Sequence, residues 1–202
     1  MLGKTELLEA IASTNRGLLA SPADQQAIQI LVARLEDRTP TPNPLAATAQ
    51  LEGAWRLLYT TSRDLLGIDR IPTYRLGQIY QCIYLAEQRI YNIAEVIGLP
   101  FLEGLVAVSA QFEAVSQKRV TIAFNRGVFG LQRVLAYKTP QSFIQKLQVE
   151  QKLPVWQGID FQINRDRQSG WLEVTYLDDD LRIGRGNQGS IFVLRKVMIS
   201  TS

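Results

Sequence analysis

The stretch TYLDDDLRIGRGNQGSIFVLRK, residues 175–196, contains two short runs of strand-forming residues separated by tight-turn residues. A second stretch far upstream, LEGAWRLLYTTS, residues 51–62, opens a strand with the pattern Gly-x-Trp. An opening strand of this kind and a closing strand that carries arginine are what the seam of a small closed β-barrel requires. We therefore predict that the two stretches close a barrel that surrounds an interior space.

The chain after residue 51 has the rhythm of an all-β domain. Candidate strands recur at intervals of about ten residues, with Gly, Asn or Pro between most of them, which is typical of a sandwich or a barrel. The candidates are Trp55–Thr61, Tyr74–Leu85, Arg89–Ile97, Leu105–Ala114, Arg119–Phe124, Val128–Tyr137, Gly158–Asn164, Trp171–Tyr176, Leu181–Gly184 and Ser190–Val197. Gln141–Glu150 fits a strand or a short helix. Several strands are apolar on both faces, so they need cover on both sides.

The first 38 residues predict two helices that pack on the barrel as a hairpin. One side of the first helix is apolar, and Gly17 stands near its end; the apolar residues are Leu7, Leu8, Ile11, Leu18 and Leu19. The second helix begins with Ser21 as N-cap, Pro22 at the first helical position and Asp24 in the first turn. Its apolar residues follow the helical repeat: Ile28, Leu31, Val32 and Leu35.

The sequence TPTPNP, residues 39–44, breaks the second helix and favours an extended connector. We therefore divide the chain into three parts. Residues 1–38 form the helical hairpin, residues 39–50 form a Pro-rich connector, and residues 51–202 form the barrel.

Composition excludes several classes of function. With 202 residues, 46% of them hydrophobic, the chain can bury one substantial core. No run approaches the roughly 18 apolar residues of a membrane span, and the N-terminal MLGKTELLEA has no apolar signal core, so we expect no targeting segment. A net charge of +3 without a basic block argues against nucleic-acid binding.

The chain contains no histidine and one cysteine, Cys82. Without histidine there is no Ser–His or Cys–His nucleophile pair, and most zinc and haem sites are excluded, so we expect a protein that is not an enzyme. The single cysteine allows no internal disulfide and no thiolate metal cluster. Its strand-like surroundings predict a buried, inert thiol.

The sequence GRGNQG, Gly184–Gly189, has the G-x-G-x-x-G spacing of dinucleotide-binding loops. That function needs a helix directly after the glycines, whereas SIFVLRK is typical of a strand. We therefore interpret the motif as a hairpin turn in which Gly186 and Gly189 supply positive φ angles.

Three consecutive acids, Asp178–Asp180, are candidates for a cation site or for paired catalytic carboxylates. A calcium site needs six or more oxygen ligands, and no second acidic cluster is evident, so we predict no metal. The preferred interpretation is a turn in which Asp180 pairs with Arg182 or Arg185 and closes one end of the barrel.

Aromatic and arginine side chains in the strands are candidates for contact with a ligand inside the barrel. The candidates are Trp55, Tyr59, Tyr80, Tyr84 and Arg182, and a tyrosine or arginine among them would orient a polar head group. Strict alternation would put Trp55, Leu57 and Tyr59 on one face of their strand. The alternative is structural, with a guanidinium of Arg182 or Arg195 capping Trp55 at the closed end of the barrel.

Three predicted loops carry large apolar residues. They are Ile97–Leu105 with Phe101, Asn125–Gly130 with Phe129, and Leu153–Trp156 with Trp156. Exposed clusters of this kind mark a ligand mouth or a membrane contact, whereas loops folded over the core would bury them. Both alternatives are open at the level of sequence.

These residues give the sequence a resemblance to the plastid lipid-associated protein (fibrillin) family. The resemblance rests on the opening strand from Gly53 to Thr60 and on TYLDDDLRIGRGNQGSIFVL, and it covers essentially the whole chain. The family motif falls on Gly53, Trp55, Tyr59, Asp180, Arg182, Arg185, Gly186 and Gly189.

The resemblance implies a lipocalin-like barrel that binds or organises hydrophobic molecules, namely carotenoids, prenylquinones or other lipids, at plastoglobules or photosynthetic membranes. Some members are partners of prenyl-chain synthesis. Plastid members carry a transit peptide and this sequence shows none. The resemblance therefore implies either a cyanobacterial homologue, cytoplasmic or peripheral at the thylakoid membrane, or a processed plastid form.

Two hypotheses of different classes follow. In the first, the barrel is a non-catalytic carrier with a bound lipid, carotenoid or prenylquinone and no other cofactor. In the second, the protein is an adaptor whose hairpin or apolar loops dock on a membrane or on a prenyl-chain synthase, with no internal ligand. Enzymatic attachment of a chromophore is a third hypothesis, which no residue pattern supports.

Overall fold

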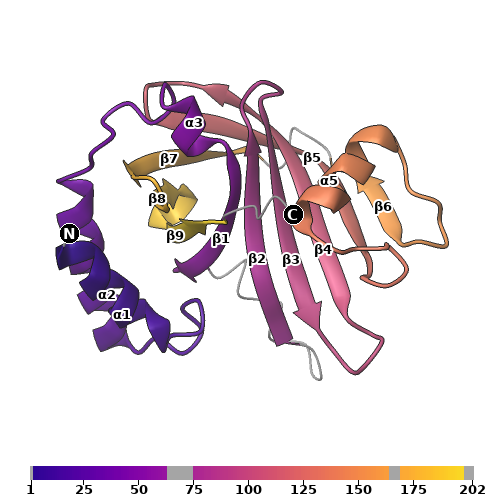
Figure 1. Cartoon of the computed structure of the whole chain (residues 1–202), viewed down its shortest axis with the longest axis horizontal. Coiled ribbons are helices and arrows are strands. Elements are labelled where there is room, and N and C mark those ends of the chain that lie inside the picture. Colours follow the sequence, from indigo (N-terminus) through magenta and orange to yellow (C-terminus); the bar gives the residue numbers. More distant parts are fainter. Residues whose placement is uncertain (1, 63–74, 164–168, 198–202) are drawn as a thin grey trace.

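The computed structural model describes residues 2–62, 75–163 and 169–197, and an antiparallel sheet closed into a barrel forms its centre (Figure 1). The strands are β1 (Gly53–Thr60), β2 (Arg75–Tyr84), β3 (Arg89–Ile97), β4 (Gly104–Ala114), β5 (Arg119–Leu131), β6 (Ile159–Gln162), β7 (Ser169–Leu177), β8 (Leu181–Gly186) and β9 (Ile191–Lys196). The helices are α1 (Leu2–Ala12), α2 (Pro22–Glu36), α3 (Thr48–Leu51), α5 (Pro140–Val149) and the short 3₁₀ turn η3 (Asn187–Gly189).

Eight of the described strands form the closed barrel. They follow one another in the order β4-β3-β2-β1-β9-β8-β7-β5, and β5 pairs again with β4, with every pair antiparallel. The ninth strand, β6, pairs with residues 126–129 of β5, beyond the part of β5 that pairs with β7. The fold class predicted from sequence, a mainly β, lipocalin-like antiparallel barrel with N-terminal helices, is confirmed.

The predicted seam between the two motif-bearing stretches is confirmed. β1 runs antiparallel to β9, from Trp55 opposite Lys196 to Thr60 opposite Phe192. The register shifts between Leu57 and Tyr59, so β1 contains a bulge. A bulge turns the next side chain to the other face of the sheet, and this changes where Tyr59 lies.

Two predicted strands are one continuous strand. The candidates Arg119–Phe124 and Val128–Tyr137 merge into β5, which pairs with the whole of β4 across a register shift at Ser109 and Ala110. After Leu131 the chain turns instead of continuing as a strand. The predicted strand ends at Tyr74 and Asn164 lie outside the described residues.

The ambiguous segment at Gln141 is helical, because its preceding residues provide a complete N-cap. The Thr139 hydroxyl accepts a hydrogen bond from the backbone N–H of Ser142, the Ser142 side chain binds back to the Thr139 backbone, and Pro140 starts the helix. The apolar face of α5 is buried against the outside of β2–β5, through Phe143, Ile144 and Leu147.

The N-terminal helices begin and end differently from each other. The predicted N-cap of α2 is confirmed, since the Ser21 hydroxyl accepts from the backbone of Asp24 and Asp24 binds back to Ser21. The prediction that α1 continues to Leu18 and Leu19 is wrong. α1 ends at Ala12 in a turn where Gly17 has φ +105°, and Leu19 is 70% exposed.

Both faces of the barrel wall are covered, as the two-sided apolar strands predict. The inner face forms one cluster, which includes Trp55, Leu57, Ile79, Val174 and Leu194. Outside, α1 and α2 cover β7, β8 and β9 along one side, and α5 covers the opposite side (Figure 1). Five apolar residues of α1 and α2 are less than about a tenth exposed, namely Leu7, Ile11, Ile28, Val32 and Leu35, whereas Leu8 and Leu31 of the predicted apolar faces are partly buried.

One end of the barrel is closed by α3. The Trp55 indole donates a hydrogen bond to the Leu51 carbonyl at 2.9 Å, and the Lys196 ammonium donates to the carbonyls of Ala49 and Gln50. Leu45 and Ala47 of the preceding connector pack against the inner cluster. This short helix, which the sequence pattern did not predict, therefore covers the closed end of the barrel.

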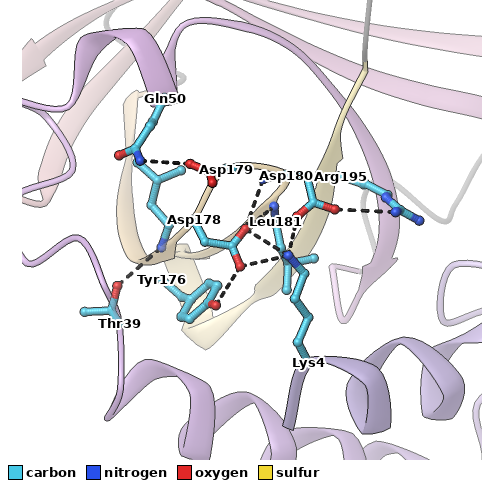
Figure 2. Close-up of polar contacts among 10 residues, drawn as sticks. Lys4, Thr39, Gln50, Tyr176, Asp178, Asp179, Asp180, Leu181 and Arg195 are labelled. Carbon is cyan, nitrogen blue, oxygen red and sulfur yellow. Dashed lines mark hydrogen bonds and ion pairs between the residues drawn. The ribbon is translucent and has the colours of Figure 1, made fainter. Parts of the chain in front are cut away.

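The acidic turn between β7 and β8 binds cations of the protein itself (Figure 2). The Lys4 ammonium of α1 contacts both Asp178 and Asp180, and Arg195 lies 3.4 Å from Asp180. The prediction that Asp180 pairs with Arg182 or Arg185 is wrong. Arg182 lines the cavity inside the barrel. Arg185, on the same strand, instead pairs with Glu36 of α2, with 2.7 Å between Nη2 and Oε2.

Candidate functional site

The barrel contains a cavity of about 950 Å³. Most of its wall is apolar, and the side chains that line it include Leu57, Ile79, Ile122, Phe124, Leu172, Val174, Phe192 and Leu194. Its mouth lies where β1 ends and where η3 joins β8 to β9, since Thr61, Ser62, Asn187 and Ser190 also line it. Asn187 is exposed, so the cavity reaches the surface at this end.

Glycines on β8 keep the interior wide. Gly184 and Gly186 both line the cavity where a larger residue would project into it. The β8–β9 connection that was interpreted as a hairpin turn is confirmed as one. Only half of the φ prediction is right, because Gly189 has φ +72° whereas Gly186 has φ −127°, which is extended backbone. Gly186 is instead close to the Phe192 ring.

A row of polar side chains lies deep in the apolar cavity. The Arg182 guanidinium stacks over the Trp55 ring at 4.9 Å and donates a hydrogen bond to the Gln81 side-chain oxygen. The Gln81 amide nitrogen in turn donates to the Asn92 side-chain oxygen at 3.0 Å. The predicted stacking of a guanidinium on Trp55 is thus confirmed for Arg182, near the end closed by α3.

Burial dominates the electrostatics of Arg182, which is 1% exposed. Loss of hydration lowers the pKa of Arg182 to about 9, because burial disfavours the charged form. Its Nη1 atom is buried and has no hydrogen-bond partner. Among the ligand-contact residues predicted from the sequence, Arg182 lines the cavity and carries a charged group with one nitrogen that makes no hydrogen bond.

Three predicted tyrosines lie outside the barrel, so their predicted place in its interior is wrong. Tyr59 is fully buried under α1 and α2, because the β1 bulge turns it outward. Tyr80 and Tyr84 pack with the cluster beneath α5, since Ile79 and Gln81 of the same strand take the inward positions. Burial raises the pKa of Tyr84 to about 12, so its phenol stays neutral.

The apolar loop residues do not line the cavity. Phe101 is 70% exposed with Arg133 stacked on its ring, Trp156 is 73% exposed, and Phe129 on β5 is half exposed. Leu105, Val128 and Leu153 of the same segments are buried in the outer cluster. In these segments the aromatic residues are exposed, as a ligand mouth or membrane contact would require. The aliphatic residues Leu105, Val128 and Leu153 are instead folded over the core.

Sequence reasoning missed Gln81 and Asn92. The signal was present, since Gln81 occupies an inward position between two apolar ones, Ile79 and Ile83. The partner was not visible in the sequence, because Gln81 meets Asn92 only through the register of β2 with β3. Cys82, next to Gln81, faces outward, and its predicted burial is confirmed; burial raises the pKa of its thiol to about 12.

A second cavity, of about 500 Å³, lies outside the barrel between α5 and strands β3–β5. Its wall is polar, and its most buried cation, Arg126, pairs with Asp160 at 2.7 Å and donates to the carbonyls of Leu147 and Glu150 at the end of α5. These bonds account for a structural role, in which Arg126 caps the helix and holds β6.

Among the described residues, no helix has the length and apolar character needed to cross a membrane. Within the same residues, no group of three or more Asp, Glu or Cys side chains is arranged to hold a metal ion.

Comparison with known proteins places this barrel among relatives. A family model described as PAP_fibrillin matches residues 1–195. The chain belongs to the PAP_fibrillin family. The match covers the N-terminal helices, the barrel and the β8–β9 motif together, so the family resemblance drawn from the two motif-bearing stretches is confirmed. No solved structure gives a significant match.

Curated plant proteins are similar to this PAP_fibrillin chain over 96% of its length. The "Light-induced protein, chloroplastic" of Solanum tuberosum is 32% identical, and the match covers 66% of that protein. The "Chromoplast-specific carotenoid-associated protein" of Cucumis sativus is 33% identical over 67% of its length. The "Probable plastid-lipid-associated protein 2, chloroplastic" of Arabidopsis thaliana is 32% identical over 70% of its length. The chain therefore spans about two thirds of these relatives.

Two of the PAP_fibrillin motif residues of this chain, Gly53 and Arg185, have structural roles. Gly53 starts β1 with φ +116°, a backbone conformation that favours glycine. Arg185 forms a two-point ion pair with Glu36, and Glu36 also accepts from the Thr175 hydroxyl at 2.6 Å. The motif thus fixes the strand ends and attaches α2 to the barrel.

Proposed function

We propose that the barrel is a non-catalytic carrier that holds one elongated hydrophobic molecule in its central cavity. The cavity of about 950 Å³ with a mostly apolar wall is the observation that supports this proposal. Binding sites for small molecules are typically about 300–1,000 Å³ and mainly apolar, with a few polar groups that orient the ligand. Such a cavity accommodates a ligand instead of being filled by the protein's own side chains.

The chemical class of the ligand in this proposal is a carotenoid, a prenylquinone or another lipid. The names of two relatives, "carotenoid-associated" and "plastid-lipid-associated", support this class. Affinity would come mainly from apolar surface removed from water, at roughly 25 cal/mol per Å² before the cost of ordering the ligand. Chemical conversion has little support, because the chain has no histidine, the commonest general acid and base.

The proposed place of work is the surface of photosynthetic membranes or of lipid bodies. Relatives with chloroplastic and chromoplastic names support a plastid setting. A processed plastid form and a cyanobacterial form, cytoplasmic or peripheral at the thylakoid, both fit this proposal.

A matched pair of substitutions tests carriage inside the barrel. Ile122 lines the cavity and its neighbour Thr121 is exposed on the outer face of β5. Protein is incubated with β-carotene or a prenylquinone and freed of excess ligand by gel filtration, and the bound pigment is measured by absorbance. Ile122→Trp should reduce the bound amount by at least about tenfold, because the indole occupies ligand space. Thr121→Trp should retain it.

Equal retention by the two variants would contradict the proposal, as would wild-type protein that retains no pigment. Thermal unfolding of both variants shows whether either substitution has disturbed the barrel itself. Lipid extracts of protein purified from a photosynthetic host provide a second measurement. Carriage predicts close to one pigment or quinone per chain.

A second candidate function is docking on a membrane or on a protein of isoprenoid metabolism such as a prenyl-chain synthase. The exposed apolar loops favour it, since the exposed fractions are 59% for Leu99, 70% for Phe101, 88% for Val155 and 73% for Trp156. Docking through the apolar face of the helical hairpin has lost its basis, because that face is buried against β7–β9.

The loops are tested by vesicle flotation with the double variant Phe101→Ser, Trp156→Ser. Docking predicts that the variant leaves the vesicle fraction while its pigment binding is unchanged, because neither residue lines the cavity. Wild-type protein that does not float with vesicles and recovers no synthase in a binding assay would contradict this candidate.

A further inference from the structure

No carboxylate among the described residues balances the charge of Arg182. Its side chain is 1% exposed and lines the cavity, and no ion pair among residues 2–62, 75–163 and 169–197 includes it. One guanidinium nitrogen donates to Gln81, whereas Nη1 is buried without a partner. An isolated buried cation is costly, since burial removes its hydration and nothing replaces it.

Other arginines of this chain show the usual arrangement. Arg126 has two bonds to Asp160, and Arg185 has two bonds to Glu36. Arg182 is more deeply buried than either, yet it faces amides and rings instead of a carboxylate. Arg126 and Arg185 thus each lie beside a carboxylate, whereas Arg182, which faces the ligand space, has none among the described residues.

Within the part of the chain that the structure describes, the side chains that contact Arg182 add no negative charge. β2 and β3 contribute the neutral amides of Gln81 and Asn92, and β1 contributes the Trp55 ring. Lys196 of β9 lies 5.5 Å from the same ring, but its ammonium donates to the carbonyls of Ala49 and Gln50 in α3 and is not part of the cavity wall. The bottom of the largely apolar cavity therefore carries a positive charge and hydrogen-bonding side chains.

We propose that the cavity selects single-chain amphiphiles with an anionic oxygen head group, a carboxylate or a phosphate, and binds them head inward against Arg182 and Gln81. This inference rests on the proposed carrier function. The head group supplies the missing counter-charge, and the tail runs along Leu57, Ile122 and Phe192 toward the mouth. A neutral hydroxyl or carbonyl accepts a hydrogen bond from Arg182 but leaves the charge unbalanced, so the anion is preferred.

The first experiment uses the unaltered full chain and three ligands with the same tail: oleic acid, oleyl phosphate and oleyl alcohol. Affinities are measured by competition against bound β-carotene. The inference predicts that at least one of the two anions binds about tenfold more tightly than the alcohol. The better of the two anions identifies the head group as carboxylate or phosphate.

The outcomes separate the two proposals. Equal affinities for the alcohol and both anions would overturn the inference and leave apolar carriage intact. No displacement of the bound pigment by any of the three ligands would overturn the inference as well. Failure of the wild-type chain to bind β-carotene, prenylquinone or any of the three lipids would overturn the carrier function with it.

The variant Gln81→Glu puts a carboxylate of nearly unchanged shape beside Arg182. It should remove the preference for anions, because the cation then has an internal partner, so that the ratio of anion affinity to alcohol affinity falls to about one. Gln26→Glu is the matched control, since Gln26 is exposed on α2 and does not line the cavity, so it makes the same charge change outside the binding site. A Gln81→Glu protein that keeps the full preference would contradict the proposal.

Discussion

The Nζ atom of Lys4 in α1 lies 2.8 Å from Oδ2 of Asp178, which is in the turn between β7 and β8 (Figure 2). Asp178 also accepts hydrogen bonds from the Tyr176 hydroxyl and from the backbone N–H groups of Asp180 and Leu181. This one carboxylate therefore shapes the turn and attaches the N-terminal helix to the closed end of the barrel.

Replacement of Asp178 should be far more damaging than replacement of its neighbour. Asp178→Ala leaves two backbone donors and the Tyr176 hydroxyl without their partner and leaves Lys4 with Asp180 alone, so we expect a loss of about 3 kcal/mol in the free energy of unfolding. Asp179→Ala removes one exposed contact with Gln50 and should cost about 0.5 kcal/mol or less. Urea unfolding of the two variants checks this, and equal losses would contradict the role given to Asp178.

Stability should fall in acid through two carboxylates. Burial opposes ionisation of Asp178 and Asp160, but hydrogen bonds from Lys4 and Arg126 respectively outweigh it and hold both pKa values below the ordinary value of 3.8. A carboxylate with a lowered folded-state pKa stabilises the protein above the unfolded-state pKa, and this contribution disappears as the pH falls through the folded-state pKa.

The unfolding free energy should therefore be flat near neutral pH with respect to these groups and decrease below about pH 4. Urea midpoints measured across this range check the prediction. Asp178→Asn should show a shallower decrease than the wild type. A slope unchanged by this substitution would mean that Asp178 does not contribute.

Gly17 should not tolerate a side chain. It has φ +105°, and a Cβ atom there would lie 2.3 Å from the Thr60 carbonyl oxygen, where Arg16 pairs with the end of β1. Gly17→Ala should therefore lower the free energy of unfolding by more than about 2 kcal/mol. Gly3→Ala is the control, since its Cβ would meet only Leu35 at 3.6 Å, and it should leave stability unchanged or raise it.

Cys82 should react only when the barrel opens. Its thiol is 1% exposed, and burial raises its pKa to about 12, so the reactive thiolate is scarce at about pH 8. A chromogenic disulfide reagent should modify it at the rate of unfolding, and the rate should rise with urea. Fast modification of the native protein would show that the wall at β2 is open.

Much of the fold was predictable because local chemistry and tertiary structure agree. The Ser21–Pro22–Asp24 start of α2, the β3 boundaries and the seam of β1 with β9 all follow from capping residues, alternation and turn signals. The predictions failed where a long-range contact overrode the local pattern. α1 ends early because the turn at Gly17 docks on β1, and the two predicted strands around Asn125 join because β4 pairs with both.

The candidate site was less predictable. The sequence identifies Arg182, but its partner Gln81, and Asn92 that bonds to Gln81, are brought to it by strands about 90 to 100 residues away. Tyr59 was assigned to the interior by alternation, and one bulge moved it outside. Asp180 was assigned to a nearby arginine, whereas its ion-pair partners are Lys4 and Arg195.

The amino-acid sequence alone determined that this chain is a β-barrel with helical cover, because strand periodicity, turn residues and helix caps act over a few residues at a time. Only the tertiary structure decided which side chains face the hollow interior. Inward orientation depends on register, bulges and closure between β4 and β5, and each of these is set by partners that are remote in the chain. The sequence supplies Arg182, and the tertiary structure places it inside the barrel, where no described carboxylate pairs with it.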